Sequence, residues 1–465
     1  MRTLLLALTN CLIGLTLVAA DSAPIEVRLP RSAKITLENG TTLFLVERHD
    51  LPIATFRWIL PSGSSISDPV GKEGLSMITA QMLRKGASSR NATQLAEAVD
   101  FVGGTLECGS SQQFAFGVAE FVKKDLDLGL ELLADTLLKP TFPEDELKKM
   151  IEQEIDGIKQ AKELPGEVLP LYFQRFLYGA HPFSRPAGGT ETSLATITRE
   201  DVIAFYSKCY APNQLALAIA GDFSSATMDQ AVRQRFGGWK KLPVSPPPLS
   251  EPQRAVGRKA LLVEKPDATQ VFFRVGNVSL ARTNTDWIAV QVVNTLFGGR
   301  FTSMLNTELR IQSGITYHAN TYFESRRVPG AFAMYFYTAN ETGMRAAKMA
   351  LDVLDRFRAK GITPEQLQSA KAYIKGQFGP TLQTNDELAD IMCDLHFYGL
   401  GPDYINTYLE RVDAVTIEDA RRVIDRYFPS QDLRFVIIGP GSVIAPIGQA
   451  IAGETTKLSI TDPGF

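Results

Sequence analysis

The sequence contains a long internal repeat, best seen in the segment TREDVIAFYSKCYAPNQLALAIAG from Thr198 to Gly221. The same order of features returns from Thr416 to Gly439 as TIEDARRVIDRYFPSQDLRFVIIG, an offset of 218 residues (416 minus 198). In each copy, a threonine precedes the acidic start of a predicted helix, a proline follows that helix, and a predicted apolar strand ends at glycine. Self-similarity at this spacing indicates a tandem duplication.

The pattern of strands and helices predicts an α+β fold made of two tandem homologous halves. In the first half, residues 33–47 and 53–60 have the pattern of strands, and residues 144–160 that of a long amphipathic helix. We expect each half to be a mostly antiparallel sheet covered by helices. The predicted halves are residues 21–242 and 257–465, joined by a proline-rich linker over residues 243–256, where proline disfavours both helix and central strand.

The composition is that of a folded protein without polyanion-binding character. The 465 residues include 48 Lys and Arg against 51 Asp and Glu, which gives a net charge of -3. With no basic block in the sequence, nucleic acid is not an expected partner. Three cysteines beyond the N-terminal segment have no metal-binding spacing, so we expect buried thiols with at most one disulfide among Cys108, Cys209 and Cys393.

Residues 1–20 have the pattern of a cleaved secretory signal peptide. Arg2 supplies a positive start, an apolar stretch covers residues 4–18, and small residues at positions 18–20 precede the expected cleavage site. No later apolar run approaches the length of a membrane-spanning helix. We therefore expect a periplasmic protein without a membrane span.

Three further phrases occur in a characteristic order along the chain. They are Gly74-Leu75 with Lys85-Gly86, the segment VGGTL at residues 102–106, and Tyr210-Ala-Pro-Asn213. Together with the duplication, they resemble the insulinase/pitrilysin family of inverted-zincin peptidases, and the length resembles its processing-peptidase-type subfamily. The resemblance implies that the two halves form half of a clamshell, which a second chain of similar size completes.

The family carries its zinc on a helix written H-x-x-E-H, in which two histidines bind the metal and the glutamate activates water. The resemblance places this motif at residues 77–81, where its His, Glu and His positions hold Met77, Ala80 and Gln81. Glu154 resembles the third ligand, but we interpret it as a solvated helix residue because one carboxylate does not hold zinc. No two of the four histidines lie within a helical turn of each other: His49, His181, His318 and His396. We expect no metal or other cofactor in this chain.

The segment ELRIQSGITY, residues 308–317, is similar to the family's Arg/Tyr pair, which contacts the substrate. Gly314 is predicted to end a helix, which leaves Arg310 in the last turns and Tyr317 on the following strand. The resemblance implies that Arg310 holds a substrate carbonyl or carboxylate and that Tyr317 donates to the scissile carbonyl oxygen. From composition alone, Arg310 could instead pair with a surface acid while Tyr317 lies half buried.

Gly103, Gly104 and Thr105 resemble the start of the family's edge strand, which accepts an extended peptide as an added strand. The two glycines could equally mark a tight turn or a bulge. A second glycine pair, Gly298-Gly299, is predicted to form a turn before a helix; it lacks the Lys-Ser/Thr of a phosphate-binding loop.

These observations predict a non-catalytic, substrate-binding subunit of a periplasmic heterodimeric zinc metallopeptidase that degrades or processes peptides. A homologous partner is expected to carry H-x-x-E-H and the zinc, while this chain contributes Arg310 and Tyr317. Without that partner the chain is expected to be inactive. The alternative is a proteolytically inactive structural or peptide-binding homologue of the family.

Overall fold

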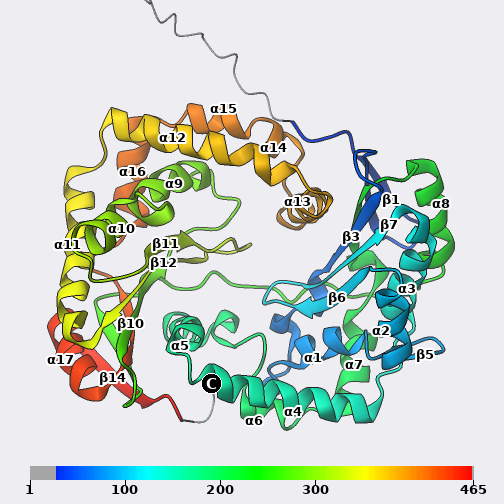
Figure 1. Cartoon of the computed structure of the whole chain (residues 1–465), viewed down its shortest axis with the longest axis horizontal. Helices are drawn as coiled ribbons and strands as arrows, with labels where there is room; N and C mark the ends of the chain where they lie inside the picture. The colour runs from blue at the N-terminus through cyan, green and yellow to red at the C-terminus, as the bar shows by residue number, and fades with distance from the viewer. Residues whose placement is uncertain (1–27, 463–465) are drawn as a thin grey trace, which may run out of the picture.

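The computed structural model describes residues 28–462 and is built on two six-stranded sheets, one in each half (Figure 1). In spatial order, the first sheet contains β1 (Ala33–Thr36), β2 (Thr42–Glu47), β8 (Ala216–Gly221), β3 (Ile53–Leu60), β7 (Ala115–Val122) and β6 (Thr105–Ser110). The second contains β11 (Ala319–Phe323), β12 (Ala331–Ala339), β10 (Gln270–Val278), β13 (Arg434–Gly439), β9 (Lys259–Glu264) and β14 (Glu454–Ser459). A separate short hairpin pairs β4 (Gly86–Ala87) with β5 (Arg90–Asn91).

The two sheets have the same core topology. In the first sheet, β2 and β8 are parallel, and β3 and β7 continue the sheet as antiparallel strands. In the second sheet, β9 and β13 are parallel, and β10 and β12 continue the sheet in the same way. Only the outermost strands differ, since β1 runs antiparallel to β2 whereas β14 runs parallel to β9. The predicted fold class, two tandem halves with mostly antiparallel sheets covered by helices, is confirmed.

One predicted strand is divided in the structure. Residues 33–47 form β1 and β2, which pair as a hairpin and not as one continuous strand. The chain reverses at Gly40, whose φ of 89° is in the left-handed region that glycine adopts without steric cost.

Helices cover both sheets. In the first half they are α1 (Leu75–Met82), α2 (Ala92–Asp100), α3 (Leu126–Leu138), α4 (Glu144–Ala161), α5 (Pro165–Tyr178), α6 (Glu191–Leu194), α7 (Arg199–Cys209) and α8 (Ser225–Phe236). In the second half they are α9 (Trp287–Asn294), α10 (Met304–Asn306), α11 (Gly343–Lys360), α12 (Pro364–Phe378), α13 (Asn385–Tyr398), α14 (Asp403–Asn406), α15 (Tyr408–Asp413), α16 (Ile417–Tyr427) and α17 (Gly441–Ile451). The long helix predicted at residues 144–160 is thus present as α4.

The repeated threonines begin equivalent helices. Thr198 caps α7 and Thr416 caps α16, and each accepts the backbone N–H of the aspartate three residues later, at 3.3 and 3.1 Å. Asp201 and Asp419 accept the threonine N–H groups in return, at 2.9 and 3.1 Å. These reciprocal bonds satisfy N–H groups that have no partner within the helix. The sequence repeat therefore encodes the same capped helix and the same central strand, β8 or β13, in each half.

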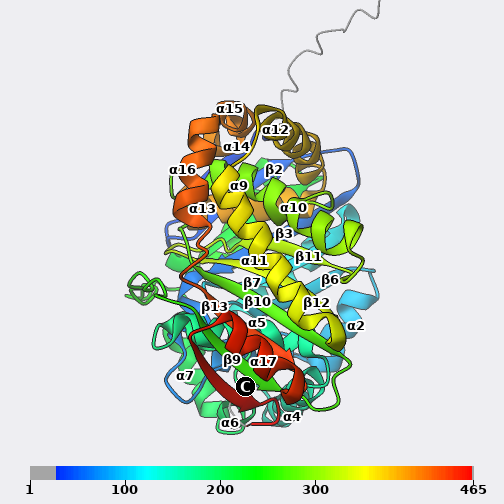
Figure 2. The same ribbon diagram turned by 90° about the vertical axis from the view of Figure 1, so that its left-hand side faces the viewer.

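Each half lends one helix to the sheet of the other half. Helix α5 packs on β10 and β13 of the second sheet, and α13 packs on β3 and β8 of the first (Figure 1). Leu169 on α5 lies in one apolar cluster with Val436 and Ile438 of β13, and Leu388 on α13 lies in another with Phe44 of β2. The opposite face of the second sheet is crossed by α11 and α17 (Figure 2). The central strands β8 and β13 are consequently buried on both faces, and the two halves are interlocked.

Residues 240–258, which include the predicted linker, contain no helix or strand. The domain boundaries themselves stay predictions. Cys108, Cys209 and Cys393 are buried free thiols. The predicted signal peptide, residues 1–20, lies outside the described residues, and no helix within residues 28–462 is long and apolar enough to cross a membrane.

Candidate functional site

Helix α1 carries the positions that resemble the zinc motif. The helix begins after Gly74, whose φ is 95°, and the buried carboxylate of Asp68 accepts the backbone N–H groups of Gly74 at 3.0 Å and Ser76 at 2.8 Å. Burial raises the pKa of Asp68 to about 7, although these hydrogen bonds act in the opposite direction. Asp68 thus anchors the N-terminus of α1 and fixes the orientation of the motif.

The side chains at the motif positions make their own contacts. The Sδ atom of Met77 accepts the N–H of Ser110 on β6 at 3.4 Å, and Ala80 is fully buried. The side-chain Nε2 of Gln81 donates to Oε1 of Glu154 on α4 at 3.0 Å. Glu154 is therefore not the solvated residue that the sequence predicted, because it is partly buried and hydrogen-bonded to the position that resembles a zinc ligand.

This donor set does not fit zinc. A thioether, a methyl group and a carboxamide replace the two imidazoles and the carboxylate that the motif requires, and only the carboxylate of Glu154 is a normal zinc ligand. Within residues 28–462, no cluster of three or more His, Cys, Asp or Glu residues could hold a metal ion. No reaction step through zinc can be assigned to the residues of this chain.

The predicted Arg/Tyr pair is brought together in the second half. Arg310 lies in a π-helical turn, Thr307–Gln312, which ends before Gly314, where φ is 66° and the N–H donates to the Arg310 carbonyl at 3.1 Å. The guanidinium carbon lies 4.4 Å from the centre of the Tyr317 ring and 4.8 Å from that of Phe301. This geometry gives a cation–π stack that orients the guanidinium.

The stack is open to solvent. Tyr317 is 71% exposed and Phe301 is 59% exposed, and Arg310 has no ion pair with any residue between 28 and 462. The nearby acid, Glu308, pairs instead with Arg356 at 3.0 Å. The alternative in which Arg310 pairs with a surface acid and Tyr317 is half buried is therefore wrong.

Two details of this region differ from the sequence-based expectation. Tyr317 lies in the loop two residues before β11, not on the strand. Thr316 holds that loop, because its hydroxyl donates to the carbonyl oxygens of His318 at 2.9 Å and Tyr337 at 2.5 Å. The role of Phe301 was missed. The turn predicted at Gly298-Gly299 is wrong, because these glycines end a π-helical segment, Thr295–Gly299, which Phe301 follows closely with its ring beside Arg310.

The structure does not combine the two groups into one site within the chain. Helix α1 and helix α10, which leads into the Arg310 turn, lie in opposite halves (Figure 1). Any site that uses both kinds of residue needs a second chain or a different arrangement of the halves.

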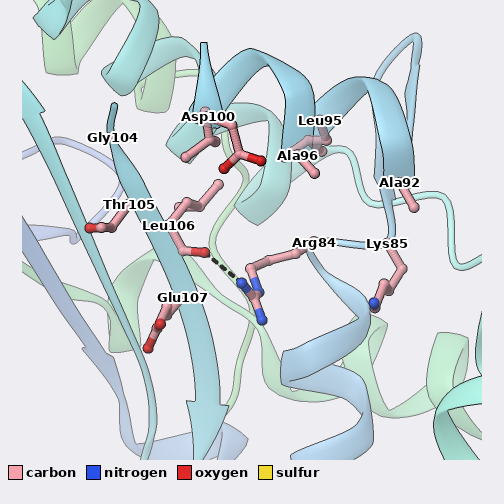
Figure 3. A pocket seen from close by; sticks show the side chains of 11 residues that line it. Arg84, Lys85, Ala92, Leu95, Ala96, Asp100, Gly104, Thr105, Leu106 and Glu107 are labelled. Atoms are coloured by element: carbon pink, nitrogen blue, oxygen red, sulfur yellow. Dashed lines mark hydrogen bonds between the residues drawn. The ribbon is translucent and has the colours of Figure 1, made fainter. Parts of the chain in front are cut away.

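The third predicted feature, the edge strand, lies next to a cavity. Thr105 begins β6, which is the last strand of the first sheet, and Gly103, with φ 64°, and Gly104 form the turn before it. The two glycines thus form a turn that leads into an edge strand, and the binding of a peptide along that edge stays a prediction. A cavity of about 310 Å³ lies between β6, α2 and the end of α1 (Figure 3). At its wall, Nη1 of Arg84 donates to the carbonyl oxygen of Leu106 at 2.7 Å.

Comparison with known proteins places this fold in a family. Residues 46–191 match the model described as insulinase (peptidase family M16), and residues 196–374 match that described as the peptidase M16 inactive domain. The chain belongs to the M16 peptidase family. The resemblance drawn from the sequence is thereby confirmed, and this M16 chain lacks the zinc-binding side chains at the motif positions.

The relatives of this M16 chain extend over most of its length. An uncharacterized zinc protease of Mycobacterium leprae is 27% identical over 74% of this chain and 78% of its own. A protein of Helicobacter pylori named a non-peptidase homolog is 23% identical over 84% of this chain and 90% of its own. A solved peptidase M16 inactive domain from Pseudomonas fluorescens superposes with a TM-score of 0.83 at 23% identity, covering 88% of this chain and 98% of its own.

Proposed function

We propose that this M16 chain is the non-catalytic, substrate-binding subunit of a periplasmic heterodimeric zinc metallopeptidase that degrades or processes peptides. One observation carries the proposal: the zinc-motif positions hold Met77, Ala80 and Gln81, whereas the Arg310 and Tyr317 pair is assembled and open to solvent. A homologous partner that carries H-x-x-E-H would supply the zinc and the second half of the clamshell.

The Arg310 and Tyr317 stack suits substrate binding. The planar guanidinium, held against two aromatic rings, can donate to a peptide carbonyl or carboxylate in a defined direction. The exposed Tyr317 hydroxyl can donate to a carbonyl oxygen as negative charge develops on it, a contribution commonly worth about 3 to 4 kcal/mol in the transition state. In this proposal the two residues act on a substrate that is bound across the interface with the partner.

The β6 edge supports the same function. An unpaired strand edge presents alternating N–H and C=O groups that can bind an extended peptide without regard to its sequence. Thr105 and the residues after it provide such an edge beside the cavity of the first half. An enclosed complex would therefore hold peptides in extended form on this subunit.

The proposal is tested by isolating the chain from its native periplasm and identifying the proteins that co-purify, with zinc counted per chain. We expect an equimolar M16 partner with H-x-x-E-H and one zinc per pair.

In the reconstituted pair, Arg310→Ala and Tyr317→Phe should each lower kcat/KM for peptides by about 100-fold or more. Two exposed residues elsewhere in the second half provide matched controls, Arg345→Ala and Tyr373→Phe. Unchanged turnover in both Arg310→Ala and Tyr317→Phe would remove their proposed role.

The alternative, a proteolytically inactive structural or peptide-binding homologue, has one specific observation in its favour. The Helicobacter pylori relative carries the name non-peptidase homolog. If the purified chain is alone or self-paired, without zinc and without peptidase activity, the alternative is correct. In that case Arg310 and Tyr317 serve binding or packing and not turnover.

A further inference from the structure

A second arginine of the second half is held between aromatic rings. The guanidinium carbon of Arg274 on β10 lies 4.8 Å from the centre of the Tyr322 ring on β11 and 5.6 Å from that of the Phe173 ring on α5. Burial lowers the pKa of Arg274 to about 10, so the side chain stays charged at neutral pH although it has lost part of its hydration. A partly desolvated charge of this kind is normally paired with an acid.

Arg274 has no acid or other acceptor as a partner within residues 28–462. Its side chain makes no ion pair or hydrogen bond there, and its Nε atom is buried without an acceptor. The two Nη atoms are not among the buried unbonded atoms, which leaves them in contact with solvent. The guanidinium therefore keeps its Nη donors for a ligand.

The charges around Arg274 add up to a positive site. Strands β10, β11 and β12 contain no acidic residue, and α5 contains only Glu167, which is exposed and does not affect the pKa of Arg274. Among residues 28–462, the carboxylate that does affect this pKa is Glu324. It is already held by Arg326 at 2.8 Å and by the hydroxyl of Tyr178 at 2.8 Å. The two arginines outnumber the one carboxylate, and this balance favours an anion.

Two more polar side chains lie in the same row of the second sheet. Tyr335 on β12 is paired with Arg274 on one side and with Asn320 of β11 on the other. Directly paired residues project to the same face of a sheet, which here is the face that α5 covers. Within residues 28–462 the Tyr335 hydroxyl has no hydrogen bond, and Oδ1 of Asn320 is buried without one. The row thus combines a guanidinium fork with a hydroxyl donor, a set that suits a carboxylate.

We propose that Arg274, together with the hydroxyl of Tyr335, binds a carboxylate of the peptide substrate, and that the Asn320 amide binds the neighbouring peptide group. The inference rests on the proposed function, because it assigns a substrate class to the half of the chain that carries Arg310 and Tyr317. A planar fork held between two rings can bind both oxygens of a carboxylate with little loss of side-chain entropy. The carboxylate can belong to the C-terminus of the peptide or to an Asp or Glu side chain.

The test uses isothermal titration calorimetry with unlabelled peptides and the full chain, both alone and in the co-purified pair after zinc is removed to prevent cleavage. Short peptides rich in Thr and Val are compared in three forms. The neutral form has a C-terminal amide and one Gln, the second has a free C-terminus, and the third has Glu in place of Gln at successive positions. A form whose carboxylate reaches Arg274 should bind at least about tenfold more tightly than the neutral form, the effect of a hydrogen bond to a charged group. A gain with the second form assigns the site to the terminal carboxylate, and a gain with the third assigns it to a side chain.

Variants connect this gain to the site. Arg274→Gln should remove the preference for a carboxylate, and Tyr335→Phe, which loses only a hydroxyl, should reduce it about fivefold. Arg345→Gln is the matched control, because Arg345 is exposed on α11 of the same half. Tyr335 is only partly buried and its hydroxyl has no hydrogen bond within residues 28–462, so Tyr335→Phe keeps the test valid even if Arg274→Gln unfolds the protein.

The possible outcomes separate the two proposals. Equal affinity of the three peptide forms overturns the carboxylate selection and leaves the peptide-binding subunit intact. The selection is also wrong if the full preference persists in Arg274→Gln, or in Tyr335→Phe where Arg274→Gln does not fold, and a preference that only Arg310→Ala removes belongs to the Arg310 stack instead. If no peptide binds to the chain or to the pair, both the selection and the peptide-binding role are wrong.

Discussion

The exchange of α5 and α13 between the halves predicts that the two halves unfold together. Leu169 on α5 and Leu388 on α13 are both 0% exposed, and each packs against the sheet of the other half. We consider Leu169→Ala and Leu388→Ala, which remove apolar contacts between the halves and leave the strands of both sheets unchanged.

The magnitude follows from complete burial. Replacing a fully buried leucine by alanine commonly costs about 3 kcal/mol, from lost transfer free energy and from the cavity left behind. Unfolding entropy is about 2.1 cal/mol/K per residue, so for a chain of this length the same cost lowers Tm by only about 3 °C. Urea unfolding is therefore the more sensitive measurement, since a change of this size clearly moves the midpoint.

The assay follows urea unfolding by tryptophan fluorescence and by circular dichroism, with Leu51→Ala as the control, because Leu51 is 60% exposed. We expect a single transition in the wild-type chain, lowered by each buried variant and unchanged in the control. Two separate transitions, of which each variant moves only one, would refute the coupling of the halves. A loss below about 1 kcal/mol in both variants would show that the exchanged helices contribute little.

Three further predictions concern the candidate site. Asp68→Asn should flatten the pH dependence of stability. The pKa of Asp68 is raised to about 7 in the folded state, above the unfolded value near 3.9, so the stability that this carboxyl contributes is present at low pH and falls by up to ~1.4 kcal/mol per pH unit between about pH 4 and pH 7. Urea unfolding at several pH values measures this difference between the variant and the wild-type chain. The double variant Met77→His and Gln81→His should bind zinc with Glu154, detected by metal analysis after dialysis, and adding Glu154→Ala should abolish that binding; a double variant without zinc would contradict the assignment of the motif positions. Gly314→Ala should cost about 1 kcal/mol of stability in urea unfolding, because φ is 66° although the space around it is open, and an unchanged urea midpoint would show that the turn relaxes.

Much of the fold could be predicted from the sequence because its signals are local. The threonine caps of α7 and α16 depend on a side chain and a backbone N–H three residues apart, so the pattern of residues specifies them directly. Likewise, the absence of histidine at positions 77 and 81 follows from residue identity alone. The division of residues 33–47 at Gly40 was missed although the sequence marks it, because Asn39-Gly40 is a typical turn dipeptide between polar neighbours.

The candidate site was only partly predictable. The spacing of Arg310 and Tyr317 indicated a pair, but not that the guanidinium stacks between two aromatic rings, one of which belongs to Phe301 in an earlier turn. The hydrogen bond between Gln81 and Glu154 joins helices that are distant in sequence, and no pattern within either helix reveals it.

The sequence by itself determined the duplication, the capped helices, the strands that end at glycine and the loss of the zinc-binding side chains, because each depends on residues close together in the chain. Only the tertiary structure decided that α5 and α13 each pack on the sheet of the other half, that Glu154 accepts a hydrogen bond from Gln81, and that Arg84 lines a cavity beside β6. An apolar helix face lowers its free energy against any complementary apolar surface, and the hydrophobic effect has no direction. The choice of partner therefore depends on the shape of the whole chain.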